Sequence, residues 1–228
     1  LRTQLTSVMG FIETLRGPAR KDQAAQKRFL DIMQGEAERM NRLVGDLLSL
    51  SRVEGEERVR PTTRIALRDV VGQVVRSLQP LADEADVALE TELGAAPVEM
   101  TGDADQLTQV FTNLIENAIK YGGSGGRGRV RMSTAAREPA LRAPGARVQV
   151  IDDGPGIDPM HLPRLTERFY RADSHRSRAL GGTGLGLAIV KHIINRHRGR
   201  LRVESELGQG ATFTVILPVS DESVAAQE

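Results

Sequence analysis

The sequence has no cysteine and no tryptophan, and only 3% of its 228 residues are aromatic. Without cysteine the chain cannot form a disulfide or a thiolate metal site, which fits a reducing compartment. No apolar run approaches the roughly 18 to 20 residues that a membrane-spanning helix needs. The net charge is +1, from 31 basic and 30 acidic residues, so it gives no electrostatic argument for binding nucleic acid or a membrane surface.

Residues 1–55 carry the apolar spacing of paired helices. Near the start, gaps of four and three residues alternate between Leu1, Leu5, Val8, Ile12 and Leu15. Gly17-Pro18 ends this helix, and a second apolar stripe runs from Phe29 to Leu50. Because two helices cannot enclose both apolar faces, the pattern predicts an antiparallel helical hairpin that forms a four-helix bundle in a dimer. An ordinary pair of core helices within one domain is the alternative.

A polar linker, residues 56–61, separates this hairpin from a region of mixed pattern at 62–219. Helices are expected at 70–78, 104–121 and 185–197, and strands at 62–67, 87–93, 98–101, 129–134, 147–151, 201–205 and 211–217. A loop is expected between 138 and 145, and the polar tail, 220–228, is predicted to be disordered. Helices set apart from mostly antiparallel strands predict an α+β fold, an α/β sandwich with one helical layer on one sheet.

The predicted helix at 104–121 has a polar edge beside its apolar face. Asn113, Asn117 and Lys120 fall at positions i, i+4 and i+7, so their side chains share one stripe. Asparagine is costly to bury without hydrogen-bond partners. The stripe therefore indicates a docked polar ligand, with a metal ion or a phosphate as the first candidates. A solvated helix face is the alternative.

Three glycine-rich segments follow. The strand ending at Asp152 runs into Gly154 and Gly156, where a ligand could come close to the backbone. The second segment, 181–187, opens a helix, and its amides together with the positive helix end suit a phosphate. The third segment, 208–213, lies in the last hairpin, where a plain tight turn explains the glycines as well as a ligand contact does.

Taken in this order, the motifs resemble those of bacterial sensor histidine kinases, within the ATPase superfamily that includes gyrase B, Hsp90 and MutL-type repair proteins. Residues 113–121 resemble the N box, 152–156 the first glycine box, Phe169-Tyr170-Arg171 the F box, 182–186 the second glycine box and 208–213 the last. The hairpin resembles the dimerisation and histidine-phosphotransfer domain, and the run 44–54 is most similar to the PhoR-like subgroup. The resemblance implies an ATP-binding domain of the Bergerat type.

The resemblance also implies ATP and Mg²⁺ as cofactors. Asn117 would hold Mg²⁺, an ion that prefers oxygen ligands. Asn113 stands where related ATPases carry a general-base glutamate, and an amide cannot take a proton, which fits transfer to a protein side chain better than activation of water. Lys120 would face the phosphates. Asp152 would accept a hydrogen bond from the adenine amino group, with Gly156 allowing the approach.

Further residues are implied to contact the nucleotide. Residues from about 158 to 182, with Arg171, His175 and Arg176, would form a mobile lid, and the glycines of the second box would cradle phosphate. The complete predicted nucleotide-binding set is Asn113, Asn117, Lys120, Tyr121, Asp152, Gly154, Gly156, Ile157, Phe169, Arg171, Gly182, Thr183, Gly184, Leu185, Gly186, Leu187 and Thr212.

The family pattern His-Glu-Leu-Arg-Thr-Pro-Leu is matched only in its second half, by residues 1–5. The acceptor histidine is therefore expected just before Leu1, and none of the four histidines present lies on the hairpin. Two interpretations stay open: the sequence begins just after that histidine, or the natural protein diverges there and is a pseudokinase. Gln4 replaces the usual proline, which predicts a straighter first helix.

Thr3 matches the threonine that, in this family, orients water during dephosphorylation of the partner, so it joins Asn113 and Lys120 as a predicted catalytic residue. A surface threonine on a helix is the alternative interpretation.

The resemblance implies the cytoplasmic catalytic core of a two-component sensor histidine kinase. It would act as a homodimer and pass phosphate from ATP to histidine and then to an aspartate in the receiver domain of a response regulator, and the full-length protein would be tethered to the inner membrane. Two alternatives are an ATP-binding pseudokinase or phosphatase, and a conformational ATPase of the gyrase and Hsp90 type. Asn113 and the hairpin disfavour the last.

Overall fold

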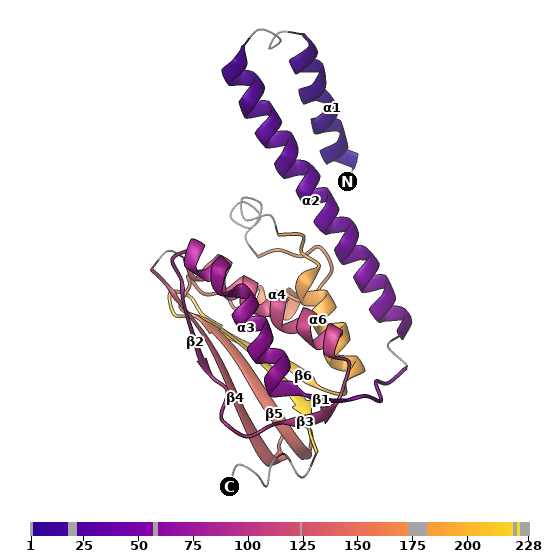
Figure 1. Cartoon of the computed structure of the whole chain (residues 1–228), viewed down its shortest axis with the longest axis vertical. Helices are drawn as coiled ribbons and strands as arrows, with labels where there is room; N and C mark the ends of the chain where they lie inside the picture. Colours follow the sequence, from indigo (N-terminus) through magenta and orange to yellow (C-terminus); the bar gives the residue numbers. More distant parts are fainter. Residues whose placement is uncertain are drawn as a thin grey trace.

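The computed structural model describes residues 2–17, 22–56, 59–123, 125–172, 182–220 and 223, without the side chains of residues 2–5, 7 and 8. Helices α1 (Arg2–Arg16) and α2 (Gln23–Glu56) form an antiparallel hairpin that projects from a layered domain (Figure 1). Their apolar faces meet at Phe11 and Phe29, whose ring centroids lie 5.5 Å apart. Within the described residues, no helix is both long and apolar enough to cross a membrane.

The domain is a sheet covered on one face by helices α3 (Leu67–Glu84), α4 (Ala104–Gly122) and α6 (Gly186–Arg196) (Figure 1). The five-stranded sheet has the order β2-β4-β5-β7-β6, with only β2 and β4 parallel to each other. These strands are β2 (Ala88–Glu92), β4 (Arg127–Glu138), β5 (Ala143–Asp152), β6 (Arg200–Glu206) and β7 (Gly210–Pro218). A two-stranded sheet pairs β1 (Arg64–Ala66) with β3 (Glu99–Thr101), and the 3₁₀ turn η1 spans Leu162–Arg164. The predicted fold class is confirmed.

Helix α4 follows the predicted pattern closely. Its apolar residues recur every three or four positions and are buried against the sheet and the other helices: Leu107, Val110, Phe111, Leu114 and Ile115. Asp103 caps its first turn by accepting a hydrogen bond from the Gln106 amide at 3.1 Å. The polar stripe of Asn113, Asn117 and Lys120 is consequently left half-buried along the edge of this face.

Three details differ from the sequence-based expectation. The loop expected at 138–145 is only four residues long, because buried Glu138 accepts two hydrogen bonds from Arg147, at 2.6 and 2.8 Å, and continues the hairpin of β4 and β5. Helix α2 ends at Glu56, within the predicted linker. The tail is held beyond residue 219, since the Ser220 amide donates to the Glu99 carbonyl and buried Ser223 receives a hydrogen bond from the Glu99 amide.

The start of α4 is tied to the end of α6 through buried polar groups. The Asp103 amide donates to Nε2 of His197 at 3.0 Å, and Nδ1 of the same ring bonds to the Ile193 carbonyl at 2.8 Å. Arg196 donates to the Asp103 carboxylate at 3.2 Å and to the Val59 carbonyl at 2.8 Å. His197 must therefore be neutral, with Nε2 as the acceptor. This cluster fixes how α4 lies relative to α6.

Replacing His197 should lower stability and alter its pH dependence. Burial lowers the pKa of His197 from its usual 6.5, with the Arg196 charge adding to this effect and the Ile193 carbonyl and Asp103 opposing it. The unfolded chain takes up a proton near pH 6.5 and the folded chain does not, so stability falls as the pH drops below about 6.5. His197→Phe leaves the Asp103 amide unsatisfied, at about 1–3 kcal/mol, and should lower the melting temperature by roughly 3–10 °C at pH 7.5.

Thermal unfolding followed by circular dichroism between pH 5.5 and 8 would check both effects. The wild-type chain should lose more stability on acidification than the His197→Phe variant does. Identical pH profiles for the two chains would contradict the assigned role of His197.

Candidate functional site

Two pockets adjoin on the helical side of the domain and share three lining residues: Asn117, Leu165 and Leu187. One, here called the polar pocket, has a volume of about 670 Å³ and is lined by residues of α2, α4 and the glycine-rich loop before α6. The other, the apolar pocket, has a volume of about 370 Å³ and extends from the end of β5 to the turn between β6 and β7. Asn117 lies where the two pockets join.

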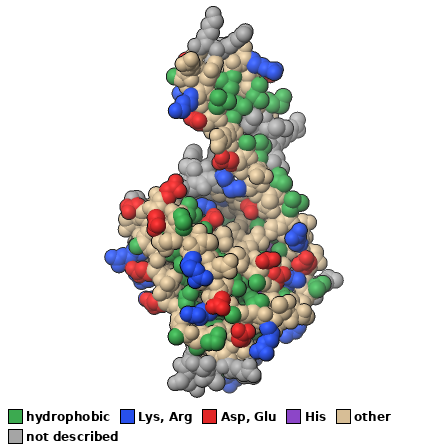
Figure 2. Space-filling view, viewed as in Figure 1, with side chains coloured by type: hydrophobic (Ala, Val, Ile, Leu, Met, Phe, Trp, Pro, Cys, Tyr) green, Lys and Arg blue, Asp and Glu red, His purple; other side chains and the backbone are tan. Residues whose placement is uncertain are grey.

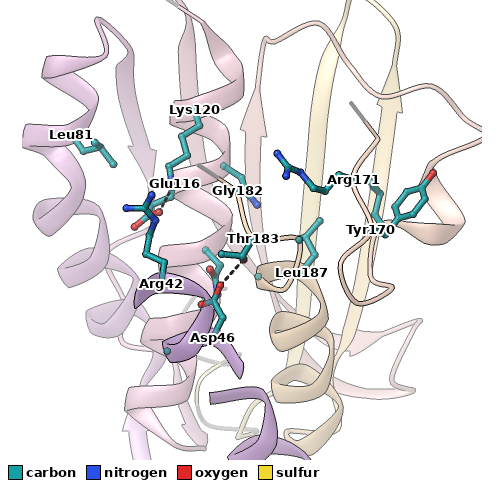
Figure 3. Close-up of a pocket in the computed structure, with 16 residues that line it drawn as sticks. Arg42, Asp46, Leu81, Glu116, Lys120, Tyr170, Arg171, Gly182, Thr183 and Leu187 are labelled. Atoms are coloured by element: carbon teal, nitrogen blue, oxygen red, sulfur yellow. Dashed lines mark hydrogen bonds and ion pairs between the residues drawn. The ribbon is translucent and has the colours of Figure 1, made fainter. Parts of the chain in front are cut away.

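The polar stripe of α4 forms one wall of the polar pocket. Asn113, Asn117 and Lys120 all line it, together with Glu116 (Figure 3). The Lys120 ammonium forms an ion pair with the Glu116 carboxylate at 2.5 Å, one helical turn away. The stripe that the sequence predicted therefore lines a pocket, and the lysine charge is partly balanced by its own helix.

The glycine-rich loop forms the opposite wall, with Gly182, Thr183, Gly184 and Gly186 as lining residues. Gly184 has a φ of +75°, a conformation that favours glycine. Its carbonyl accepts a hydrogen bond from the Phe169 amide at 2.8 Å. The loop is thereby held next to the start of α6, whose positive helix end can attract an anion.

The two walls come very close at Gly186. A Cβ atom at this position would lie 3.0 Å from Oδ1 of Asn113, so a larger residue would press on the asparagine side chain. Glycine here lets α6 begin beside the polar edge of α4. The close approach places backbone amides of the helix start near the asparagine amide group.

The apolar pocket has one buried carboxylate, that of Asp152 at the end of β5. Asp152 is 7% exposed and accepts a hydrogen bond from the Gly154 amide at 3.0 Å. Burial raises the pKa of this carboxyl group and the nearby Asp153 charge adds to the rise, while hydrogen bonds from the amides of Gly154 and Ala211 lower it. A largely apolar pocket with a buried carboxylate suits a flat heterocycle that carries a hydrogen-bond donor.

Gly156 has a packing role in addition to its place at the apolar pocket. Its φ is +72°, and a Cβ atom would lie only 2.0 Å from the Glu206 carbonyl oxygen. The neighbouring Pro155 carbonyl accepts a hydrogen bond from the Gly208 amide at 2.8 Å. Gly156 is therefore required because the first glycine segment packs against the turn between β6 and β7, although it also lines the apolar pocket.

Most of the predicted set lies at these pockets, and a few residues do not. Tyr121 and Ile157 line the apolar pocket, Arg171 lines the polar one and Leu187 lines both. Leu185 is fully buried in the core. The Gly154 amide donates a hydrogen bond to the Asp152 carboxylate.

Two further residues of the predicted set, Phe169 and Thr212, do not line either pocket. The Phe169 side chain is 57% exposed and does not line either pocket, and only its backbone supports the glycine-rich loop. Thr212 sits between Ala211 and Phe213 on β7, and these two neighbours line the apolar pocket. Because side chains alternate along a strand, Thr212 points to the other face of the sheet.

Some predictions fall outside the described part of the chain. The side chain of Thr3 is one of these, and so are Gly181 and the lid residues His175 and Arg176. Their assigned roles stay predictions.

Sequence reasoning missed the contribution of α2. Arg42, Gly45 and Asp46 line the polar pocket although they are more than 65 residues before the α4 stripe. Nothing in the local sequence marks them, because the contact depends on how α2 packs against the domain. Glu116, by contrast, lies one turn from Lys120 and could have been found from helical spacing.

The amide oxygen at the junction of the two pockets suits a magnesium ion whose other ligands are water and the oxygens of a bound phosphate compound. Among the described residues, no group of three or more His, Cys, Asp or Glu side chains could hold a metal. Mg²⁺ is commonly bound by one or two protein oxygens together with substrate phosphates and water. The amide oxygen of Asn117, between the polar and apolar pockets, fits that arrangement.

Family models match both parts of the chain. Residues 102–221 match the model of the histidine kinase-, DNA gyrase B- and HSP90-like ATPases. Residues 1–56 match the model of the His Kinase A (phospho-acceptor) domain. The ATPase match contains all of the predicted glycine boxes, and the second match covers the helical hairpin.

Individual proteins agree with these matches. The chain is 41% identical to the phosphate regulon sensor protein PhoR of Pseudomonas aeruginosa over 94% of its own length and 46% of that protein. It is 35% identical to the sensor-like histidine kinase SenX3 of Mycobacterium bovis, over 96% of this chain and 51% of that protein. The chain thus spans about half the length of these relatives.

Among solved structures, the histidine kinase AdeS of Acinetobacter baumannii superposes with a TM-score of 0.71 at 26% identity, covering 96% of this chain and 97% of that one. The histidine kinase ThkA, in complex with the response regulator protein TrrA, has the same fold, with a TM-score of 0.74 at 22% identity, over 97% of this chain and 59% of that one. The predicted resemblance is confirmed, including its PhoR-like character: the chain belongs to the histidine kinase-, DNA gyrase B- and HSP90-like ATPase family, within the sensor histidine kinases.

Proposed function

We propose that this chain is the ATP-binding and phosphotransfer core of a two-component sensor histidine kinase. It binds Mg-ATP, transfers the γ-phosphoryl group to a histidine in the residues that precede Leu1, and passes it to an aspartate of a response regulator. The observation that carries the proposal is the junction of a polar and an apolar pocket at Asn117. This shape matches a molecule with a flat base at one end and charged phosphates at the other.

The apolar pocket takes the adenine base. Asp152 is the buried acceptor at its end, and Ile157, Leu187 and Phe213 supply apolar walls. A carboxylate accepts a hydrogen bond from the exocyclic amino group of adenine, whereas guanine presents a carbonyl oxygen in the equivalent position. The two oxygens would repel each other, which favours adenine nucleotides over guanine nucleotides.

The polar pocket takes the triphosphate. Lys120 and Arg171 supply positive charge, and the amides at the start of α6 supply donors for phosphate oxygens. Asn117 would hold Mg²⁺, which when bound neutralises charge on the phosphates. Phosphoryl transfer needs mainly positioning and charge stabilisation from the protein, and these residues provide both.

Asn113 supports transfer to a protein group rather than to water. Its amide lies beside the start of α6, within the polar pocket. An amide group cannot accept a proton from an attacking water. This favours the kinase over a conformational ATPase that hydrolyses its nucleotide.

The hairpin is proposed to dimerise and to receive the response regulator. Among the described residues, seven large apolar side chains on the hairpin are exposed in the single chain: Met9, Ile12, Leu30, Ile32, Val44, Leu47 and Leu48. Figure 2 shows hydrophobic side chains gathered on this projection. A four-helix bundle would bury them. The ThkA structure contains a response regulator, and a receiver domain is the partner expected for this chain.

Asn117→Ala should abolish most Mg²⁺-dependent nucleotide binding. Titration calorimetry with ATP, with and without Mg²⁺, should show at least a tenfold loss of affinity when the metal is present, because the variant lacks the metal ligand. Asn195→Ala, on the exposed side of α6, is the matched control and should bind ATP like the wild type. Equal Mg²⁺ dependence in all three chains would rule out the metal role.

The transfer step is measured in a chain that carries the proposed acceptor histidine. With the preceding residues present, incubation with γ-labelled ATP should give an acid-labile, base-stable phosphoryl group on the hairpin, and Asn117→Ala should prevent its formation. Nucleotide binding without any such label would point to the pseudokinase alternative.

Asp152→Asn should weaken adenine binding much more than it weakens folding. The variant turns a donor toward the adenine amino group, so we expect roughly a tenfold or greater loss of ADP affinity, on the order of 1.4 kcal/mol. Without nucleotide, the melting temperature should stay close to that of the wild type or rise, because a buried charge with a raised pKa is removed. A large drop in melting temperature with unchanged ADP affinity would show that Asp152 is purely structural.

Leu30→Glu should convert a dimer into a monomer. Leu30 is exposed on α2 of the single chain, and a charge in the centre of a helical bundle is strongly unfavourable. Met160→Glu, at a still more exposed apolar position in the ATP-binding domain, is the control and should leave the mass unchanged. Multi-angle light scattering would distinguish the two, and a wild-type monomer at micromolar concentration would exclude dimerisation through the hairpin.

A further inference from the structure

Helix α2 of the hairpin reaches into the polar pocket of the ATP-binding domain. Oδ2 of Asp46 accepts a hydrogen bond from the Thr183 hydroxyl at 2.6 Å, and Thr183 belongs to the glycine-rich loop (Figure 3). The same hydroxyl oxygen lies 3.3 Å from the Leu185 amide. An acidic side chain thus occupies the wall that is suited to phosphate.

The position of Asp46 is fixed by contacts in the next two turns of α2. Ser49 and Gln109 of α4 exchange hydrogen bonds at 2.8 and 2.9 Å. Leu50 and Val53 are buried in the core of the domain. Glu54 forms an ion pair with Arg168, and its carboxylate lies 3.4 Å from Nε2 of His192. These contacts define the docked arrangement of α2, and they hold Asp46 against the loop.

Asp46 is half-buried and surrounded by other charges of the pocket. Burial raises its pKa most, the hydrogen bond from Thr183 lowers it, Glu116 raises it, and Lys120 and Arg42 lower it. The lining of the polar pocket contains three basic residues, Arg42, Lys120 and Arg171, and two acidic ones, Asp46 and Glu116. Neutralising Asp46 alone would therefore double the formal charge of the lining, from +1 to +2.

We propose that Asp46 is a specificity-determining residue of the nucleotide site. In the docked arrangement of α2, its negative charge lowers the affinity for ATP more than the affinity for ADP. The proposal rests on the function proposed above. The Asp46 carboxylate competes with phosphate oxygens for the Thr183 hydroxyl, and it repels each added phosphate charge at short range. Docking of α2 and binding of ATP are consequently antagonistic, and ADP is less affected.

The reciprocal effect follows from linkage. If docking weakens ATP binding by some factor, ATP weakens docking by the same factor. Loading with ATP would then favour release of the ATP-binding domain from α2, whereas loading with ADP would leave it closer to the docked arrangement.

The test is a comparison of nucleotide affinities in charge variants of α2. Asp46→Asn keeps an acceptor for Thr183 and removes the charge, and Asp31→Asn, on an exposed part of the same helix, is the matched control. Titration calorimetry with Mg²⁺ and ATP, ADP or AMP gives the ratio of the ATP and ADP dissociation constants. We expect this ratio to fall roughly fivefold or more in Asp46→Asn, which is the lower end of usual coupling factors. The affinity for AMP should change less than the affinities for ATP and ADP do. The ratio in Asp31→Asn should equal that of the wild type.

Several results would overturn the proposal. One is an equal change in the affinities of ATP, ADP and AMP in Asp46→Asn, which indicates a purely structural role. Another is a ratio of the ATP and ADP dissociation constants that stays the same in Asp46→Asn as in the wild type. If the wild-type chain binds no adenine nucleotide at all, the proposed function fails first. Binding that is unaffected by Asp46→Asn leaves that function intact and removes only this inference.

Discussion

The burial of one face of α4 is the constraint on which the site depends. Five large apolar side chains of this helix are fully buried, and at about 1.5–3 kcal/mol each they contribute on the order of 10 kcal/mol before the entropy of folding is counted. This favourable free energy of burial is larger than the cost of placing two half-buried asparagines at the edge, where each unsatisfied polar group costs about 1–3 kcal/mol. Because the apolar face cannot rotate away, Asn113 and Asn117 are held toward the pockets without a ligand to organise them.

The glycines of the motifs are required for close packing within the protein, in addition to their place at the proposed nucleotide site. Gly156 is forced by the Glu206 carbonyl and Gly186 by Asn113, so both permit close packing between segments far apart in sequence. Glycines of a ligand-binding motif can thus be required by the packing of other protein groups as well as by a ligand. Packing between these loops thus defines the shape of the pocket.

Helical features of the site could be predicted from sequence because spacing within a helix is local. The stripe of Asn113, Asn117 and Lys120 needed only the helical period. The position of Thr212 depends on strand register, since Ala211 pairs with Asp152 across the sheet and its neighbours must alternate. The part played by Asp46 depends on the packing of a separate helix, and no local pattern encodes that contact.

The hairpin geometry bears on how the proposed acceptor and the ATP site can meet. Phe11 faces Phe29 in the antiparallel pair, so the start of α1 lies near residue 39 of α2, about seven residues from Asp46. At 1.5 Å per residue this is roughly 10 Å along the helix, too far for direct transfer, which needs reacting atoms about 3–3.5 Å apart. Under the proposed function, phosphate would reach a histidine of the same chain in that region only after the docked arrangement opens, and the proposed opposition between Asp46 and ATP would favour that opening.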